Sequence, residues 1–386
     1  MTQISKFRFP TQINFGSGAI RLTASLVLDG KAKRPLIVTD QALAKTPMLT
    51  SLVSGLEAKG LAVAVYSEAA GNPLISHVEQ GVRAYKAHDA DAVLSIGGGC
   101  ALDVGKAIAL MSHHPGNILD YEDDKPNGLP VRADLLPLTI SIPTTAGTGS
   151  EVGGSSVVSR DDNHQKIIVW GAALIPRHVI ADPDLTLSLP PHLTAATGMD
   201  ALTHNVEAYL AKNFHPICEG IALEGLRYVN RYLVRAFENP SDREARGGML
   251  MAAMMGAIAF QKGLGVTHSC AHALSTCYDL HHGLANAMMI VPSMRFNYEQ
   301  QAEKFTTMGE VVGIQGSASE KGQGFIRWLG ELCRTLKIPN SLSELNVKLT
   351  PRLLDVATQD TCHLNNTRAC TRADFEKLFQ EGGAHV

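Results

Sequence analysis

The pattern of hydrophobic residues changes in character about halfway along the chain. Up to about residue 185, short apolar runs rich in β-branched residues alternate with stretches of helical periodicity. The runs typical of buried strands are Pro35–Thr39, Leu61–Ser67, Asp91–Ile96 and Leu138–Ile142. Such strands separated by helices predict a parallel sheet covered on both faces, with ligands at the carboxyl ends of its strands.

From about Leu189 onward, strand-like runs nearly disappear and long helical patterns replace them. These patterns cover His192–Leu210, Pro216–Phe237, Ser241–Gln261, Ser269–Tyr278 and Ala285–Phe296. Pro190 and Pro191 mark the boundary. We therefore expect an α/β domain over residues 1–188, followed by an all-helical domain over residues 189–386.

Composition narrows the class of protein. The chain has 386 residues, of which 45% are hydrophobic and 18% charged, with a net charge of −3, so neither nucleic acid nor a membrane is an expected partner. Met1–Pro10 has no apolar signal core, and the apolar run Met249–Phe260 is too short to span a bilayer, which predicts a cytoplasmic protein. Seven cysteines without a Cys-x-x-Cys pair argue against a disulfide framework or a thiolate zinc site.

A run of three glycines is the first candidate binding element. Gly97–Gly99 directly follows the strand pattern Asp91–Ile96 and precedes a helix over Ala101–Ser112. Glycines allow close approach of a ligand to the backbone, and free N–H groups at a helix start favour a phosphate. The run fits neither Gly-x-Gly-x-x-Gly nor the Walker motif, and a tight turn without a ligand explains it equally well.

Two further segments have both a binding and a local explanation. Asp40 ends an early strand, where a carboxylate can accept hydrogen bonds from ribose hydroxyls and repel a 2′-phosphate, or can simply cap a helix. Residues 143–151, Pro-Thr-Thr-Ala-Gly-Thr-Gly-Ser-Glu, are rich in hydroxyls and glycine. Such a loop can hold a nucleotide or form a polar turn.

Two pairs of potential metal ligands have i, i+4 spacing, which places both side chains of each pair on one helix face. They are Asp200 with His204 and His268 with His272, and His282 follows. A single histidine is more typical of a core or surface position, but several among small apolar neighbours need a partner. Together they predict a divalent metal site. Five candidates for about four positions leave one in another role, and Zn(II) and Fe(II) fit equally.

These segments together resemble the iron-containing, group III alcohol dehydrogenases, whose fold is shared with dehydroquinate synthase. The resemblance covers nearly the whole chain and rests on motifs in the family's order: residues 97–106, 143–151, Asp182-Pro183 with Leu185, 198–204 with Glu207, and His268, His272 and His282-Gly283. It implies a Rossmann-like N-terminal domain that binds the dinucleotide and a helical C-terminal domain that binds metal and substrate.

The resemblance also implies roles for individual residues. Asp200, His204, His268 and His282 align with the metal ligands, and His272 with a catalytic histidine beside the nicotinamide. Positions that contact the cofactor are Asp40, Asn72, Gly98, Gly99, Thr144, Thr145, Thr148, Val157 and Lys166. The implied cofactors are NAD and Fe(II), with Zn(II) fitting the same ligands, and the implied assembly is a homo-oligomer of at least two chains.

The chain departs from the family pattern at several positions. Cys100 stands for a usual serine, Gly105 for a usual alanine, and Thr367 for a frequent proline. The segment Phe260–Gly265 is one residue shorter than the common form and resembles that of 4-hydroxybutyrate dehydrogenases. Its Lys262 is interpreted either as a partner for a substrate carboxylate or, slightly better, as a solvated surface lysine.

The resulting prediction is an NAD- and metal-dependent alcohol dehydrogenase or aldehyde reductase that acts on a small primary alcohol. An ω-hydroxy acid is the alternative substrate, argued from Lys262. A lyase of the dehydroquinate synthase type is disfavoured by the 143–151 loop and the Asp200–His204 pair. The intact ligand positions disfavour a metal-free reductase of the maleylacetate type and a binding protein without catalysis.

Overall fold

The computed structural model describes residues 9, 11–123 and 125–385. By its internal contacts the chain divides into two compact units. Within the described residues, the α/β unit consists of 9–145 and 150–187, and the helical unit consists of 146–149 and 188–385. The segment Ala146–Gly149 therefore packs with the helical unit, although residues of the α/β unit flank it.

A six-stranded, wholly parallel sheet in the order β1-β8-β5-β4-β2-β3 forms the centre of the α/β unit. Its strands are β1 (Gln12–Phe15), β2 (Pro35–Val38), β3 (Ala64–Tyr66), β4 (Ala92–Gly97), β5 (Leu138–Pro143) and β8 (His178–Ala181). The strands predicted from apolar runs correspond to β2, β3, β4 and β5. The edge strand β1 and its neighbour β8 were not predicted; β1 has exposed residues at both ends and half-buried ones between them, so it does not form a buried apolar run.

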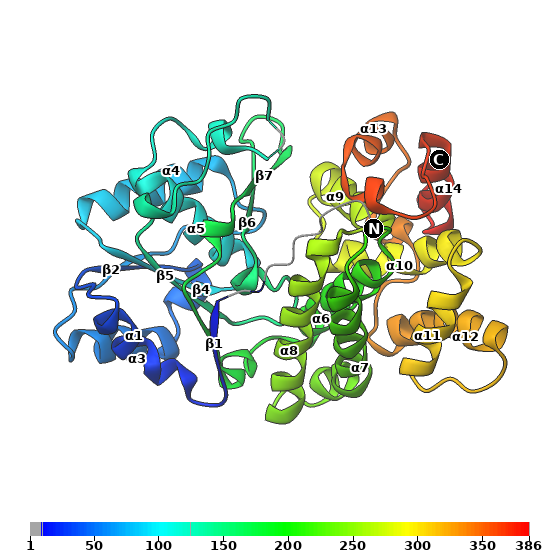
Figure 1. The fold of residues 1–386 in the computed structure, drawn as a ribbon, viewed down its shortest axis with the longest axis horizontal. Helices are drawn as coiled ribbons and strands as arrows, with labels where there is room; N and C mark the ends of the chain where they lie inside the picture. Colours follow the sequence, from blue (N-terminus) through cyan, green and yellow to red (C-terminus); the bar gives the residue numbers. More distant parts are fainter. Residues whose placement is uncertain (1–8, 10, 124, 386) are drawn as a thin grey trace. The chain divides into compact units, whose positions relative to one another are not determined.

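Helices cover both faces of this sheet (Figure 1). They are α1 (Thr23–Asp29), α2 (Gln41–Ala44), α3 (Pro47–Glu57), α4 (Ile75–Ala87) and α5 (Gly99–His113). Successive residues of β2 point to opposite faces: Leu36 and Val38 join the core under α4 and α5, whereas Ile37 joins the core under α1 and α3. Burial on both faces explains the unbroken apolar runs from which the sheet was predicted.

The α/β unit also contains an antiparallel pair of strands, β6 (Ser155–Ser159) and β7 (Lys166–Trp170), which the sequence analysis did not anticipate. Short 3₁₀ helices complete this unit: η1 (Ala19–Leu22), η2 (Ile118–Tyr121), η3 (Ala133–Leu135), η4 (Ser150–Val152), η5 (Ala172–Leu174) and η6 (Pro183–Thr186).

The regular elements described in the second unit are all helices, which confirms the predicted fold class. The α-helices are α6 (Pro191–Leu210), α7 (Pro216–Glu238), α8 (Arg243–Ala259), α9 (Val266–Tyr278), α10 (His282–Tyr298), α11 (Ala302–Val311), α12 (Ala318–Thr335), α13 (Pro351–Gln359) and α14 (Arg372–Glu381). The 3₁₀ helices are η7 (Phe260–Lys262), η8 (Leu342–Leu345) and η9 (Cys362–Asn365).

Three of these helices, α6, α9 and α10, carry the potential metal ligands. Helix α6 begins at Pro191, whose missing N–H costs nothing in the first turn, and it is buried along most of its length. Asp279 caps the end of α9 and adopts a left-handed conformation with φ of 52°. A short turn follows, and α10 begins at His282. Helix α10 packs against both α6 and α9, which brings the ligand-bearing faces together.

No single helix among the described residues is long and apolar enough to cross a membrane. The segments Arg243–Lys262 and Val266–Tyr278 meet the criteria of length and composition only as a pair, bent by 107°. Many of their side chains belong to the hydrophobic core of the helical unit.

Candidate metal centre and cofactor site

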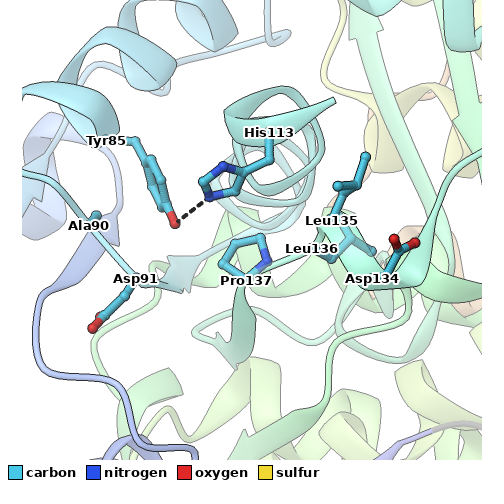
Figure 2. Close-up of a pocket in the computed structure, with 8 residues that line it drawn as sticks. All are labelled: Tyr85, Ala90, Asp91, His113, Asp134, Leu135, Leu136 and Pro137. Atoms are coloured by element: carbon cyan, nitrogen blue, oxygen red, sulfur yellow. Dashed lines mark hydrogen bonds between the residues drawn. The ribbon is translucent and has the colours of Figure 1, made fainter. Parts of the chain in front are cut away.

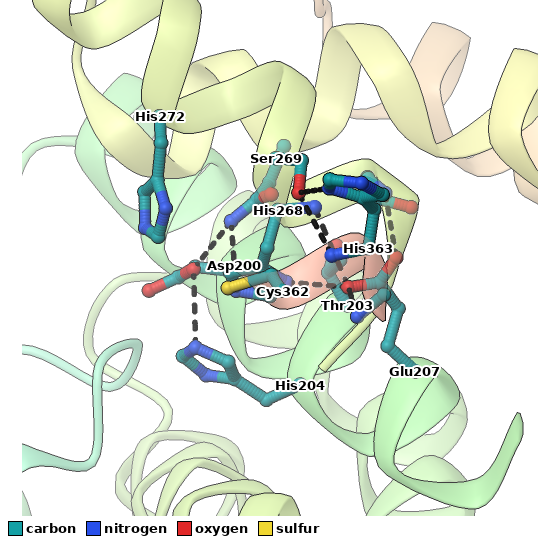
Figure 3. A network of polar contacts seen from close by, with 12 residues as sticks. Asp200, Thr203, His204, Glu207, His268, Ser269, His272, Cys362 and His363 are labelled. Carbon is teal, nitrogen blue, oxygen red and sulfur yellow. Dashed lines mark hydrogen bonds and ion pairs between the residues drawn. The ribbon is translucent and has the colours of Figure 1, made fainter. Parts of the chain in front are cut away.

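The helical unit brings four potential metal ligands into one cluster. Asp200 and His204 come from α6, His268 from α9 and His282 from the first position of α10. Each offers one ligand atom, and these atoms lie within 4.8 Å of one another. Figure 3 shows three of the four, Asp200, His204 and His268. The i, i+4 spacing thus correctly predicted that these helix faces lie against one another. It did not identify which of the five candidate residues lies outside the cluster, namely His272.

The chemistry of these side chains suits a divalent cation. Asp200, His204 and His268 are all at least 95% buried, and Asp200 Oδ1 lies 3.7 Å from His204 Nε2 and 3.5 Å from His282 Nε2. Burial lowers the pKa of His204 from 6.5 to about 4, so its imidazole is neutral at pH 7 and keeps a lone pair for a ligand bond. One carboxylate with three imidazoles is a donor set for Zn(II) or Fe(II).

A buried carboxylate fixes the orientation of His268. Glu207 accepts a hydrogen bond from His268 Nδ1 at 2.7 Å, and also from the backbone N–H groups of Thr267 at 2.7 Å and Gly265 at 2.9 Å. Burial would raise the pKa of Glu207, but these hydrogen bonds outweigh it and hold the pKa below its usual value. Because Nδ1 carries the proton, His268 presents Nε2 to the cluster.

Asn286 is a further contact of the cluster that the sequence analysis missed. It follows His282 by one helical turn and is fully buried. Its amide nitrogen lies 2.8 Å from Asp200 Oδ1, 3.2 Å from His282 Nε2 and 3.4 Å from His268 Nε2. The signal in the sequence was its i, i+4 spacing from His282, which places both side chains on one face of α10.

His272, the fifth candidate, faces a different partner. Its Nδ1 donates to Asp360 Oδ2 at 2.7 Å, and Asp360 Oδ1 accepts from Ser269 Oγ at 2.7 Å and from the backbone N–H of Cys362 at 2.9 Å. Burial raises the pKa of Asp360, but His272 and the hydrogen bonds overcome this and hold it well below its usual range. His272 therefore carries its proton on Nδ1, with its ring stacked on that of His282 at 5.2 Å between centroids.

The interpretation of Lys262 as a surface residue is wrong, and its pairing within the protein removes the support for a contact with a substrate carboxylate. The side chain is fully buried, so it is not a solvated surface lysine. Its Nζ donates to Glu219 Oε1 at 2.7 Å and to the backbone oxygen of Tyr209 at 2.9 Å, so the ammonium is already paired within the protein. Lys304 Nζ shares both acceptors, at 2.8 and 2.6 Å, and the two lysines together cap the carboxyl end of α6.

Several predicted cofactor residues meet where parallel strands end. Gly98 and Gly99 follow β4, and Thr144 and Thr145 follow β5. The backbone N–H of Thr144 donates to the backbone oxygen of Gly97 at 2.9 Å. A Cβ on Gly98 would lie 3.3 Å from Thr145 Cγ2, so glycine permits this close approach. Glycine here therefore lets the turn before α5 lie against the loop that follows β5.

Asp40 caps a helix and lies near the glycine turn. Its Oδ1 accepts hydrogen bonds from the N–H groups of Ala42 at 2.8 Å and Leu43 at 2.9 Å, which makes it the N-cap of α2. Its other oxygen would lie 3.8 Å from a Cβ placed on Gly97. Capping therefore occupies one carboxylate oxygen and leaves the ribose prediction untested.

The remaining cofactor residues form a second neighbourhood in the α/β unit. Val157 lies on β6 and Lys166 begins β7, where it pairs with Ser159. The N–H of Ser159 donates to the oxygen of Pro73 at 2.7 Å, which places the loop containing Asn72 next to this pair of strands.

Thr148 lies in the segment that belongs to the helical unit, between two glycines that serve packing. A Cβ on Gly147 would lie 2.8 Å from Thr197 Cβ on α6, and one on Gly149, whose φ is 62°, would lie 2.3 Å from Ala257 Cβ on α8. The glycines of this motif thus allow the segment to lie directly on two helices, a purpose that was not inferred from the sequence.

A hollow of about 540 Å³ lies at the end of the sheet where β4 and β5 begin, opposite the end that carries the glycine turn (Figure 2). Asp91 and Pro137, which line it, immediately precede β4 and β5. Tyr85 and His113 face each other there with 3.5 Å between Oη and Nε2. Residues predicted to bind cofactor or metal do not line this hollow, so it is separate from the predicted site.

Comparison with known proteins assigns the chain to a family. Residues 10–183 match the family described as iron-containing alcohol dehydrogenase, and residues 194–382 match the C-terminal part of the Fe-containing alcohol dehydrogenase family. The chain is 36% identical over 384 residues to alcohol dehydrogenase 4 of Saccharomyces cerevisiae (strain YJM789), covering 99% of both chains. It is 32% identical to 4-hydroxybutyrate dehydrogenase of Cupriavidus necator, covering 96% of this chain and 98% of that one.

Among solved structures, the sulfoacetaldehyde reductase of Bifidobacterium kashiwanohense, crystallised with NAD⁺, is similar with a TM-score of 0.88. The identity is 25%, and the match covers 98% of each chain. The α/β sheet, the helical unit and the cluster of one aspartate and three histidines define a dehydrogenase of the metal-binding type. The chain belongs to the iron-containing alcohol dehydrogenase family, and its class of activity is oxidation of CH–OH groups and the reverse reduction.

Proposed function

We propose that this protein is an NAD- and iron-dependent alcohol dehydrogenase or aldehyde reductase acting on small primary alcohols. The observation that carries the proposal is the buried cluster of Asp200, His204, His268 and His282. A cation held there acts as a Lewis acid that polarises the substrate oxygen. The proposed division of labour is an α/β domain (1–188) for NAD and a helical domain (189–386) for metal and substrate.

The residues of the chain then have definite tasks. Asp200 supplies the carboxylate of the site, and the imidazoles of His204, His268 and His282 complete the ligand set. We place the phosphates of NAD at Gly98, Gly99, Thr144 and Thr145, and contacts along the rest of the cofactor at Asn72, Thr148, Val157 and Lys166. Asp40 repels a 2′-phosphate, which favours NAD over NADP.

His272 receives the proton of the alcohol in this proposal. The hydrogen bond to Asp360 holds a proton on Nδ1 and leaves Nε2 as an acceptor. Bound NAD would supply the acceptor for the hydride of the alcohol. His272 Nε2 accepts the hydroxyl proton when the alcohol is oxidised to the aldehyde and returns it when the aldehyde is reduced. Asp360 stabilises the imidazolium that forms, because it stays ionised.

An anaerobic activity assay on chelator-treated protein tests this proposal. Fe(II), Zn(II) or no metal is added back, with NAD or NADP and a panel of short alcohols, diols and ω-hydroxy acids. We expect activity to return with Fe(II) and NAD, to be lost in His204→Ala, and to be kept in His192→Ala, an exposed histidine on the same helix. Metal-independent activity, or a preference for NADP, would contradict the corresponding half of the proposal.

An ω-hydroxy acid is the second candidate substrate. The similarity to 4-hydroxybutyrate dehydrogenase along nearly the whole chain supports it, whereas Lys262 no longer does because Glu219 pairs with it. The same substrate panel decides between the two. We also expect a homo-oligomer of at least two chains in the cytoplasm, which light scattering after gel filtration and cell fractionation would test.

A further inference from the structure

Asn286 makes an unusual set of contacts for a buried amide. Its Nδ2 donates to Asp200 Oδ1 at 2.8 Å and lies 3.2 Å from His282 Nε2 and 3.4 Å from His268 Nε2. Each of these three atoms belongs to a proposed metal ligand. The amide nitrogen therefore lies across the face formed by three of the four ligand side chains.

The orientation of the amide follows from the same contacts. With the carbonyl turned toward the cluster, Oδ1 would meet the carboxylate oxygen of Asp200 at 2.8 Å, where two acceptors repel each other. The NH₂ group must therefore face Asp200. The opposite end, Oδ1, is buried and has no hydrogen-bond partner among the described residues. A side chain kept only for packing has no reason to carry this cost.

A second buried asparagine on the same helix provides the contrast. Asn297 donates to Asn366 Oδ1 at 3.0 Å and accepts from Asn366 Nδ2 at 2.7 Å, so both ends of its amide are paired and join two parts of the core. Asn286 uses only its donor end, and donates to the Asp200 carboxylate. This difference indicates that Asn286 serves the ligand cluster and not the cohesion of the helical unit.

We propose that Asn286 is a positioning residue: its amide donates to Asp200 and fixes that carboxylate beside the imidazoles of His268 and His282, in the arrangement that binds the metal. The proposal rests on the metal-dependent function proposed above. Without the amide, the Asp200 carboxylate loses its side-chain donor and can rotate, and part of the binding free energy is spent on restoring its position. Outer contacts of this kind typically change metal affinity about 10- to 100-fold.

Metal affinity of the full-length protein tests this directly, without reference to turnover. Zn(II) is titrated against a competing chelator for the wild type and for Asn286→Leu, which keeps a similar shape but has no donor. We expect the dissociation constant to rise roughly 10- to 100-fold in Asn286→Leu. Asn297→Ala is the matched control, and its dissociation constant should stay within about twofold of wild type, because Asn297 contacts none of the ligands.

Asp200→Ala separates failure of this inference from failure of the proposed function. If Asp200→Ala abolishes Zn(II) binding while Asn286→Leu binds as wild type does, the metal site stands and the role of Asn286 is overturned. If the wild type binds no Zn(II), or Asp200→Ala binds it unchanged, the metal-dependent function itself is wrong.

Folding of the variants is measured alongside by circular dichroism and thermal melting. Asn286→Ser, which keeps one small hydroxyl donor, is the second variant and is expected to bind Zn(II) more weakly than wild type. Loss of the folded state in both variants would overturn the proposal, because it would assign Asn286 to the cohesion of the core. An equal loss of affinity in Asn297→Ala would overturn it as well, since any disturbance of α10 would then have the same effect.

Discussion

Asp360→Asn should weaken catalysis without removing the metal. Asp360 accepts hydrogen bonds on both oxygens, from His272 Nδ1 on one and from Ser269 and the Cys362 backbone on the other. An asparagine has one oxygen, and keeping it toward Ser269 and Cys362 turns its NH₂ group toward His272. The imidazole must then accept on Nδ1 and carry its proton on Nε2, the atom at which we place the proton of the alcohol.

The size of the effect follows from the bond that is lost. A hydrogen bond to a charged group contributes about 1.5–3 kcal/mol. The pKa of Asp360 is held well below its usual range, so the carboxylate is ionised at neutral pH and the bond to His272 is of this charged kind. If that energy orients His272 in the transition state, kcat should fall roughly 10- to 100-fold, since about 1.4 kcal/mol corresponds to a factor of ten.

The assay measures kcat, KM and bound metal for the wild type, Asp360→Asn and the control Asp355→Asn. Asp355 lies on α13, just before Asp360, and forms an exposed ion pair with Arg372 at 2.8 Å, so its substitution should change kcat by less than about twofold. Unchanged kcat in Asp360→Asn at wild-type metal content would refute the role given to the His272–Asp360 pair. Loss of metal in that variant would refute it too, because Asp360 would then support the ligand cluster.

Three further predictions concern other parts of the chain. Gly105→Ala should destabilise the protein by about 1–3 kcal/mol, because the added Cβ would lie 1.9 Å from Ser95 Oγ, and Ser95→Ala should restore part of the loss in a double-mutant cycle of thermal unfolding. Asp40→Ala should raise kcat/KM with NADP relative to NAD, and an unchanged ratio would remove Asp40 from the cofactor site. Burial lowers the pKa of Lys262 from 10.5 to about 8, so the unfolded chain binds more protons between these values and stability should rise with pH across them. Lys262→Met should abolish this rise, worth up to about 3 kcal/mol, when urea unfolding is compared at the two ends of the window.

The sequence predicted those elements whose physical signal is local. Strand β4 is a run of six buried residues, and such runs are visible without any knowledge of their neighbours. Strand β1 is not, because Gln12 and Phe15 are exposed and the two residues between them only half-buried, at the edge of the sheet where pairing with β8 stabilises the strand. Nothing in the sequence explained glycine in place of the family's usual alanine at position 105. The reason is that Ser95 on β4 leaves no room for a Cβ there, which only the packing of α5 on β4 reveals.

In the candidate site, too, the sequence predicted the local geometry but not the contacts made by the fold. Asp200–His204 and His268–His272 have identical spacing, and each pair does share a helix face, yet only the first pair places both side chains in the candidate metal cluster. His268 turns toward the cluster because Glu207 holds its Nδ1, whereas His272 is held by Asp360, 88 residues further along the chain. Periodicity determines which side chains share a face. The partner that orients each ring determines what it does, and that partner comes from the tertiary fold, so the difference between a ligand and a proton acceptor could not be read from the spacing of the histidines.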